Sequence, residues 1–180
     1  MIRDSWAALG PRDLPGWSPE PDDPWMIRPP GPITVPPVPD VTIEPTDDAL
    51  RFEEAAFLNA GGAPPRRAGE LHPAGSHTYP GLTLFLAQRE GRPIGTALAF
   101  QHANGVVVSA VAVLADERGK GIGAALTAAA VRRAPHLPAT LTASALGNNL
   151  YERLGFRRLA RPRHWHPPGV SRGSLTEPPP

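Results

Sequence analysis

The chain has 180 residues, of which 41% are hydrophobic, enough to enclose one core of ordinary size. It contains no cysteine, which excludes a disulfide framework, a thiol nucleophile and a cysteine-ligated zinc. A formal charge of +1 gives no reason to expect a nucleic-acid partner. No apolar run reaches the ~18 residues that span a bilayer, and the first ten residues lack the apolar segment of a signal peptide. We therefore expect a cytoplasmic protein with no membrane partner.

The prolines divide the chain into three parts. Twelve of the 25 lie in residues 1–46 and six lie in residues 162–180. Because proline blocks helix interiors and sheet ladders, residues 1–40 are predicted to form a largely extended, proline-rich arm. Its tryptophans could anchor it to the domain or to a partner. Residues 41–165 are predicted to form the folded domain, and residues 166–180 a flexible tail.

The domain is predicted to begin with a short strand at 41–44 and a helix within 46–62. Thr46 is a candidate cap for this helix, since acidic residues follow it in the first turn and glycines follow the last. Phe52 and Phe57 are interpreted as packing residues. Residues 61–80 are rich in turn formers and predict a long loop, a kind of segment that is often functional.

Three strands of an antiparallel meander are expected next, at 81–88, 93–101 and 106–115. Between the last two, Asn104-Gly105 is expected to supply the positive φ angles of a tight hairpin turn. The strand at 106–115 is an apolar run without alternation, which is typical of a central strand covered on both faces.

The second half of the domain alternates helices and strands. Its predicted elements are a helix at 120–133, a strand at 139–144, a helix at 148–155 and a strand at 156–166. Leu150 and Leu154 are expected on the buried face of the second helix, and Gly155 as its C-terminal cap. Pro162 interrupts the last strand and favours an edge position. The order predicts an α/β fold, more fully an α+β mixed sheet, in which an antiparallel meander leads into a βαβ crossover.

The stretch DERGKGIGAAL, residues 116–126, sets three glycines at the start of a helix. Helix starts attract anions, and glycine lets an anion approach the backbone closely. A P-loop is excluded, because Lys120 precedes a glycine and no magnesium-binding hydroxyl follows. A dinucleotide-binding fold is excluded as well. That fold requires a carboxylate at the end of the next strand, which this chain lacks. It also does not begin with a three-strand antiparallel meander, which this chain is predicted to have.

The segment VAVLADERGKGIGAAL resembles the acyl-CoA signature of the GNAT acetyltransferase superfamily. The core of that signature is Gln/Arg-x-x-Gly-x-Gly/Ala, and Arg118, Gly121 and Gly123 occupy its three fixed places. The segment ASALGNNLYERLGF is similar to the second signature of the family, small-x-x-small-x-x-Leu-Tyr-x-x-Leu-Gly-Phe. The resemblance covers roughly residues 41–165 and implies a GNAT-type acyl-CoA N-acyltransferase fold.

The resemblance implies acetyl-CoA as co-substrate. Its pyrophosphate would meet the backbone N–H groups at the helix start, and its pantetheine arm would pair with the preceding strand. The residues implied to bind it are Val111, Ala112, Val113, Arg118, Gly119, Lys120, Gly121, Ile122, Gly123, Ala124 and Asn148. No metal is expected, since His164 and His166 alternate on one strand face but lack a third ligand.

The family resemblance points to Tyr151 as the acid that protonates the departing thiolate. A phenol with a pKa of ~10 stays protonated at neutral pH and can donate to sulfur. Because Tyr151 follows Leu150, its side chain should project about 100° away from the buried face, toward the groove. The other interpretation of Tyr151 is a packing residue.

The general base is left open, because the central strand carries no carboxylate where many family members have a glutamate. Glu70, His72 and His77 in the long loop could reach an acceptor or be solvated, and His102 is interpreted as a turn residue. A water-relayed base, or an amine that arrives neutral, is also compatible with the sequence.

The sequence thus predicts an N-acetyltransferase that transfers the acetyl group of acetyl-CoA to a primary amine of a small molecule or protein by direct attack. The alternative is a non-catalytic acyl-CoA-binding sensor or interaction module, favoured by the missing base and disfavoured by Tyr151. A third possibility is an interaction protein whose arm carries the function. The acceptor and the oligomeric state, a homodimer included, stay open.

Overall fold

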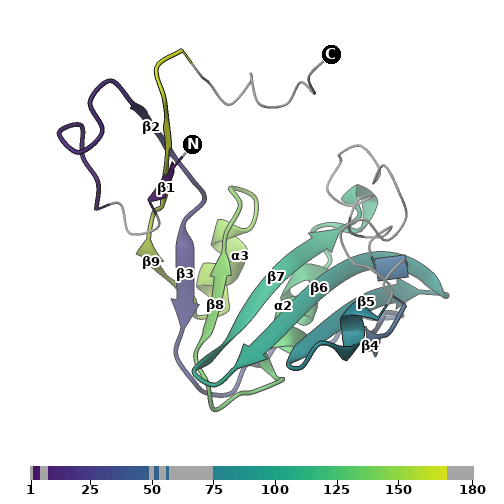
Figure 1. Cartoon of the computed structure of the whole chain (residues 1–180). Helices are drawn as coiled ribbons and strands as arrows, with labels where there is room; N and C mark the ends of the chain where they lie inside the picture. The colour runs from purple at the N-terminus through teal and green to yellow at the C-terminus, as the bar shows by residue number, and fades with distance from the viewer. Residues whose placement is uncertain (1, 5–7, 49–50, 53–55, 57–74, 170–180) are drawn as a thin grey trace.

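A computed structural model of the chain describes residues 2–4, 8–48, 51, 52, 56 and 75–169, which form a large and a small β-sheet (Figure 1). The large sheet contains, in spatial order, β4 (Thr42–Thr46), β5 (Leu82–Arg89), β6 (Arg92–His102), β7 (Gly105–Val113), β8 (Ala139–Thr142), β3 (Trp25–Arg28) and β9 (Arg157–Ala160). Its neighbouring strands are antiparallel except β7 and β8, which are parallel. The predicted mixed α/β fold, with a meander that leads into a βαβ crossover, is confirmed.

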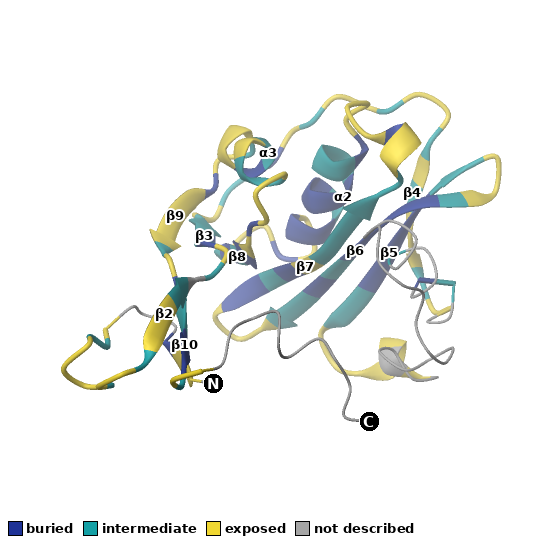
Figure 2. Cartoon of the chain, turned by 90° about the horizontal axis from the view of Figure 1, so that it is seen from above, coloured by how far each residue is buried: buried dark blue, intermediate teal, exposed yellow. Residues whose placement is uncertain are grey.

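Helix α2 (Ile122–Val131) is the crossover between β7 and β8, and it packs closely on one face of the sheet. Its buried residues include the small Thr127, Ala128 and Ala130, and Figure 2 shows the helix lying along the sheet with buried stretches. A Cβ added at Gly95 of β6 would lie 2.9 Å from both Ala112 O and Leu126 Cδ1. The glycine therefore lets the helix approach the strands, which brings the start of α2 close to the end of β7.

The opposite face of the meander carries a smaller core around Phe52, which is fully buried and clusters with Leu84. Phe52 is thus a packing residue as predicted, whereas Phe57 lies outside the described residues. The helix cap differs from the prediction. Asp48 Oδ1 accepts a hydrogen bond from Arg51 N (2.9 Å), while Thr46 ends β4 and its hydroxyl accepts from Asp48 N (3.1 Å).

The hairpin between β6 and β7 has a two-residue turn at a position one residue earlier than predicted. Its two turn residues are Ala103 and Asn104, because His102 already pairs with Gly105. The predicted positive φ angles at Asn104 and Gly105 are wrong, since neither residue has one. Gly105 serves a close approach instead, because a Cβ there would lie 3.1 Å from Pro138 O.

The single edge strand predicted at 156–166 is wrong, because the segment divides at Pro162 into two strands in different sheets. β9 forms the edge of the large sheet, and β10 (Arg163–His166) is the centre of the small one. β10 pairs with β1 (Ile2–Asp4) on one side and β2 (Ser18–Pro21) on the other. Pro162 has no N–H to donate to a neighbouring strand, so the pairing stops there. Its carbonyl accepts a hydrogen bond from Asp22 N (2.9 Å) at the point where the chain passes from one sheet to the other.

The proline-rich N-terminal segment contributes a strand to the interior of the large sheet. β3 pairs with β8 and β9 at once, and its Met26 is fully buried in the main core. Pro24 and Pro29 flank this strand, so the prolines end it without interrupting its ladder. Arg28 of this strand also contacts the C-terminal end of α3 (Asn148–Arg153), because its Nε donates to Leu154 O (3.0 Å).

Within the described part of the chain, no helix has the length and apolar character needed to cross a membrane.

Candidate active site

A fork opens in the large sheet where β7 and β8 separate. The two strands pair only at their beginnings, through Val106 with Ala139 and Val107 with Thr140, and diverge beyond that point (Figure 1). The prediction that this strand is covered on both faces is therefore wrong for its second half, where Ser109 is exposed. The open edge of β7 can pair with a ligand in place of a neighbouring strand.

A β-bulge in β7 accompanies the fork. Thr96 of β6 pairs with Ala112, and Leu98 pairs with Ser109, so two residues of β7 stand opposite one of β6. Ala110, one of the two, has a φ of 49°, and its carbonyl accepts a hydrogen bond from the buried Thr96 hydroxyl (2.8 Å). A bulge bends and twists its strand. The bend turns β7 away from β8.

A cavity of about 1040 Å³ begins in this fork and extends to the start of α2. Most of the residues predicted to bind the co-substrate or to act in catalysis line it. They are Val111, Ala112, Val113, Arg118, Gly119, Gly121, Ile122, Gly123, Ala124 and Tyr151. Lys120 and Asn148, which were predicted with them, do not line it. Ser144, Gly147 and Arg153 also line the cavity and were not predicted, although all three lie in the second sequence signature.

The loop before α2 presents backbone N–H groups to the cavity. The first hydrogen bond of the helix runs from Ala125 N to Gly121 O (3.0 Å), so the preceding N–H groups, of residues 122–124, have no acceptor within the helix. Gly119 and Gly121 have φ angles of 77° and 86°, a region that favours glycine. No side chain caps this helix start. The start is therefore open to an anion from outside.

A buried carboxylate holds this loop in place. Glu117 Oε2 pairs with Lys120 Nζ (3.1 Å) and with Arg89 Nη2 of β5 (3.2 Å). The hydrogen bond from Lys120, together with the charge of Arg89, outweighs burial and lowers the pKa of Glu117. Glu117 itself lines the cavity, whereas Lys120, which pairs with it, does not.

Tyr151 of α3 is the buried residue of its helix, whereas Leu150 and Leu154, predicted on the buried face, are only half-buried. Its ring packs edge-on against Phe156, with centroids 5.9 Å apart. Gly155 ends the helix as predicted, with a φ of 85°, and Phe156 N then donates to Tyr151 O (3.0 Å). Burial raises the pKa of the Tyr151 hydroxyl, which keeps it protonated.

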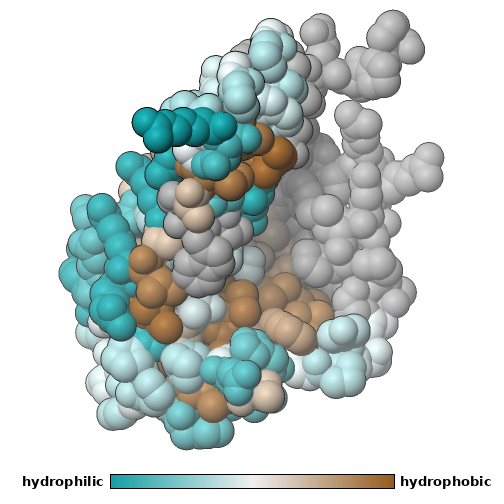
Figure 3. Space-filling model, turned by 60° about the vertical axis from the view of Figure 1, so that its left-hand side comes forward, coloured by the Kyte–Doolittle hydropathy of each residue, from teal (hydrophilic) through white to brown (hydrophobic). Residues whose placement is uncertain are grey.

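A second cavity, of about 460 Å³, lies on the other side of the fork and is lined by β3, β7 and β8. Both cavities are lined by Ala110, Val111, Ser144 and Tyr151. In the space-filling view, hydrophobic residues are visible near the middle of the face shown, with hydrophilic ones on the left, above and below (Figure 3). Tyr151 therefore lies in the wall that the two cavities share.

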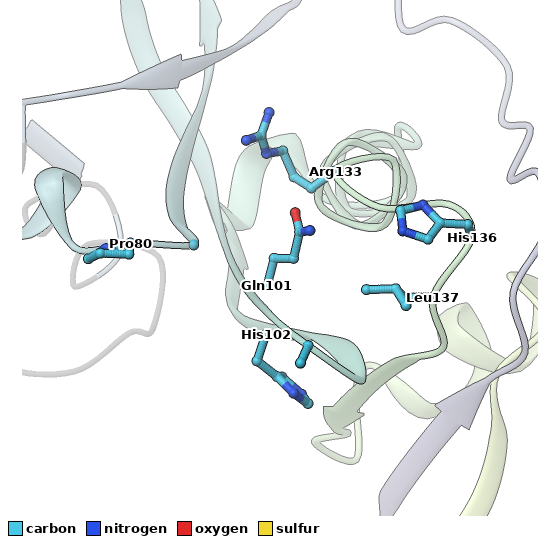
Figure 4. A pocket seen from close by; sticks show the side chains of 8 residues that line it. Pro80, Gln101, His102, Arg133, His136 and Leu137 are labelled. Atoms are coloured by element: carbon cyan, nitrogen blue, oxygen red, sulfur yellow. The ribbon is translucent and has the colours of Figure 1, made fainter.

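None of the described candidates for the general base lies in the fork. His102 is the last residue of β6, beside the hairpin turn, and its Nδ1 accepts from Asn104 N (3.3 Å). Its side chain lines a shallow hollow at another place, together with Gln101, Arg133 and His136 (Figure 4). His77 lies exposed in a 3₁₀ helix at Ser76–Thr78. Two further candidates, Glu70 and His72, lie outside the described residues.

His164 and His166 lie in β10 and contact acidic residues of the N-terminal segment. His164 Nε2 is 3.5 Å from Asp22 Oδ2, and His166 Nε2 is 3.3 Å from Glu20 Oε2. In the described parts of the chain, no group of three histidine, aspartate or glutamate side chains is arranged to hold a metal ion.

Comparison with known proteins agrees with this architecture. Residues 80–158 match the family model "Acetyltransferase (GNAT) domain". A GCN5-related N-acetyltransferase from Kribbella flavida is 27% identical, with a TM-score of 0.66 over 88% of this chain. The chain spans 63% of the length of that protein. No similar protein was found among curated sequences.

Two further solved structures share the fold at lower identity. A GCN5-related N-acetyltransferase from Sphaerobacter thermophilus is 22% identical, with a TM-score of 0.57 over 86% of this chain and 55% of its own. An acetyltransferase from Trypanosoma brucei is 21% identical, with a TM-score of 0.55 over 68% of this chain and 96% of its own.

Proposed function

We propose that the chain is an N-acetyltransferase that uses acetyl-CoA, because residues 80–158 match an acetyltransferase (GNAT) domain and this match indicates an acyltransferase. The acceptor is a primary amine of a small molecule or peptide, and the reaction takes place in the cytoplasm. One observation carries the proposal. A single cavity connects the open N–H groups at the start of α2, the edge of β7 from which β8 has separated and the hydroxyl-bearing side chain of Tyr151.

The donors in this cavity fit the parts of CoA. The N–H groups of residues 122–124, with the partial positive charge of the helix start, suit its pyrophosphate. The edge of β7 at residues 111–113, where β8 is no longer paired, suits the amide-bearing pantetheine arm, which can pair with it as an added strand. At Val113 the arm would replace Arg118 Nε, which donates to Val113 O (3.1 Å). A Cβ at Gly123 would stand 3.2 Å from Leu150 Cδ2, so this glycine keeps the space between α2 and α3 open.

Tyr151 acts as the acid in this proposal. The amine nitrogen forms the new C–N bond to the acetyl carbonyl carbon, and the C–S bond breaks with its electron pair remaining on sulfur. Tyr151 donates its proton to this thiolate and regains one from solvent, while the surplus proton on nitrogen leaves to solvent. Burial raises the pKa of Tyr151, so the hydroxyl carries its proton at the pH of the reaction, while the same shift makes it a weaker acid.

The second candidate function is an acyl-CoA sensor without turnover. It is favoured by the absence of a carboxylate on β7, whose residues at the fork are Ser109 and four small or aliphatic ones. In that case the first cavity binds acyl-CoA in the same way, and the second cavity binds no acceptor.

The test combines ligand binding with turnover. CoA at ~100 times its dissociation constant should stabilise the fold by roughly 2.7 kcal/mol, which is measured as a rise in Tm. Thiol release with a panel of amines then identifies an acceptor. Tyr151→Phe should lower kcat by roughly 10²–10⁴-fold and leave the acetyl-CoA Kd nearly unchanged. Unchanged turnover in this variant would remove Tyr151 from the chemistry, and CoA binding without turnover on any amine would favour the sensor.

A further inference from the structure

The second cavity takes one wall from the N-terminal segment. Arg3 lines it from β1, Trp25 from the start of β3, and Asp23 from the segment just before β3. Trp25 pairs with Thr142 of β8, and Ala143 N donates to Pro24 O (3.0 Å). The same antiparallel register sets Asp23 opposite Ser144, and opposed residues project on the same face of a sheet. Ser144 lines both cavities, so Asp23 lies beside the passage between them.

The two neighbouring acids at this point differ in their partners. Asp22 is held by Arg3, whose Nη2 lies 3.2 Å from its Oδ2, and by His164 at 3.5 Å. Its side chain is only 14% exposed. Asp23 is exposed, and within the described residues its carboxylate forms no ion pair. The charge of Arg3 is thus neutralised by Asp22, and the charge of Asp23 is available to a ligand.

We propose that Asp23 binds the ammonium group of the acceptor, so that the acceptor class is a small primary amine with an apolar body and no carboxylate beside the amine. The inference rests on the proposed function. Asp23, two residues before β3, supplies the negative charge that β7 lacks. A carboxylate adjacent to the amine would be repelled by Asp23, while Arg3, already paired, offers it little compensation. Trp25, Val107 and Leu159 provide the apolar contact for the rest of the molecule.

A volume of about 460 Å³ suits a small molecule and is open toward the fork, where Tyr151 stands. The ammonium held by Asp23 releases one proton to the solvent at the open mouth. The neutral amine then attacks as described above, so no further reactant is required. Asp23 is thereby an acceptor-binding residue that contacts the reacting amine.

The experiment measures the binding of two probe amines to the protein saturated with CoA. Phenethylamine and phenylalanine differ by the carboxylate beside the amine. The wild-type complex should bind phenethylamine at least 10-fold more tightly than phenylalanine. Asp23→Asn should weaken phenethylamine binding by roughly 10–100-fold, the effect of one charge-assisted hydrogen bond. Asp23→Glu should restore part of this loss. Glu44→Gln removes the same charge from β4, at the other edge of the sheet, and should change nothing.

The acetyl-CoA Kd should be the same in all four proteins, which excludes a folding defect. Equal phenethylamine binding by the wild type and Asp23→Asn would overturn the inference, as would a failure of the wild type to bind the amine. Both results are independent of turnover. The proposed function fails by a separate result, in which the wild type binds acetyl-CoA and the amine but releases no thiol.

Discussion

Gly147→Ala should displace the ring of Tyr151 without removing its hydroxyl. Gly147 precedes α3 with a φ of −87° and a ψ of −20°, a conformation that alanine adopts without strain. The Cβ of the alanine would lie 2.6 Å from Tyr151 Cε2 and 3.3 Å from its Cζ. Real Cβ atoms do not come that close to a neighbour, so the ring must retreat toward the 3.4 Å at which ordinary contact begins.

The effect on the reaction should exceed the effect on folding. A misplacement on the order of 1 Å in a catalytic group can cost about 10²-fold in rate, and we expect a loss of that size in kcat. Overpacking costs about 1–3 kcal/mol, and the lower chain entropy of alanine in the unfolded state offsets about 0.4–1 kcal/mol of it. The variant should thus unfold at a moderately lower denaturant concentration and remain folded under assay conditions.

A double-mutant cycle with Tyr151→Phe is the assay, with thiol release as readout and the acceptor identified by the amine panel. If the loss arises from the position of the hydroxyl, Gly147→Ala should lower kcat in the wild-type background and have little further effect in Tyr151→Phe. An equal loss of kcat in both backgrounds would refute the reasoning, because the alanine would then act through something other than the phenol. Unchanged kcat in the single variant would refute it as well.

Two further predictions concern the loop before α2. Gly121→Asp should abolish CoA binding and preserve the fold, because it sets a negative charge at the open N–H groups. Gly91→Asp, at a positive φ of 76° in the β5–β6 turn, is the matched control for backbone strain, and equal losses of CoA binding in both would contradict the prediction. Glu117→Gln tests the ion-paired loop through pH. The pKa of Glu117 in the fold is lower than its ordinary value of 4.5, so its contribution to stability is present above about pH 4.5 and is lost as the pH falls through the lower folded value. The Tm of the wild type should therefore fall more steeply on acidification than that of Glu117→Gln. Asp116→Asn, which removes an exposed neighbouring acid, should behave as the wild type, and parallel curves for the wild type and Glu117→Gln would show that Glu117 contributes nothing.

Local sequence determined the elements whose cause is local. Gly119 and Gly121 adopt positive φ angles where a helix starts, and Gly155 does so where one ends, because glycine lacks the Cβ that opposes this conformation. The meander and the crossover helix likewise follow from hydrophobic patterns and turn residues along the chain. The residues named for the co-substrate site adjoin those patterns, which is why most of them line one cavity.

The tertiary structure decided everything that depends on pairing between distant segments. The insertion of β3 between β8 and β9 joins residues more than a hundred positions apart, and a strand bounded by prolines gives no local sign of its partners. The fork depends on a bulge whose register is set by β6, and Pro162 marks a break without saying which sheet follows it. Asp23 lies opposite Ser144 when the long-range register of β3 and β8 is continued, and both line the second cavity. The central strand β7 carries no acid, and the N-terminal segment brings Asp23 to the second cavity beside it. The sequence could not predict this, because side chains from different strands meet only when the sheet has formed.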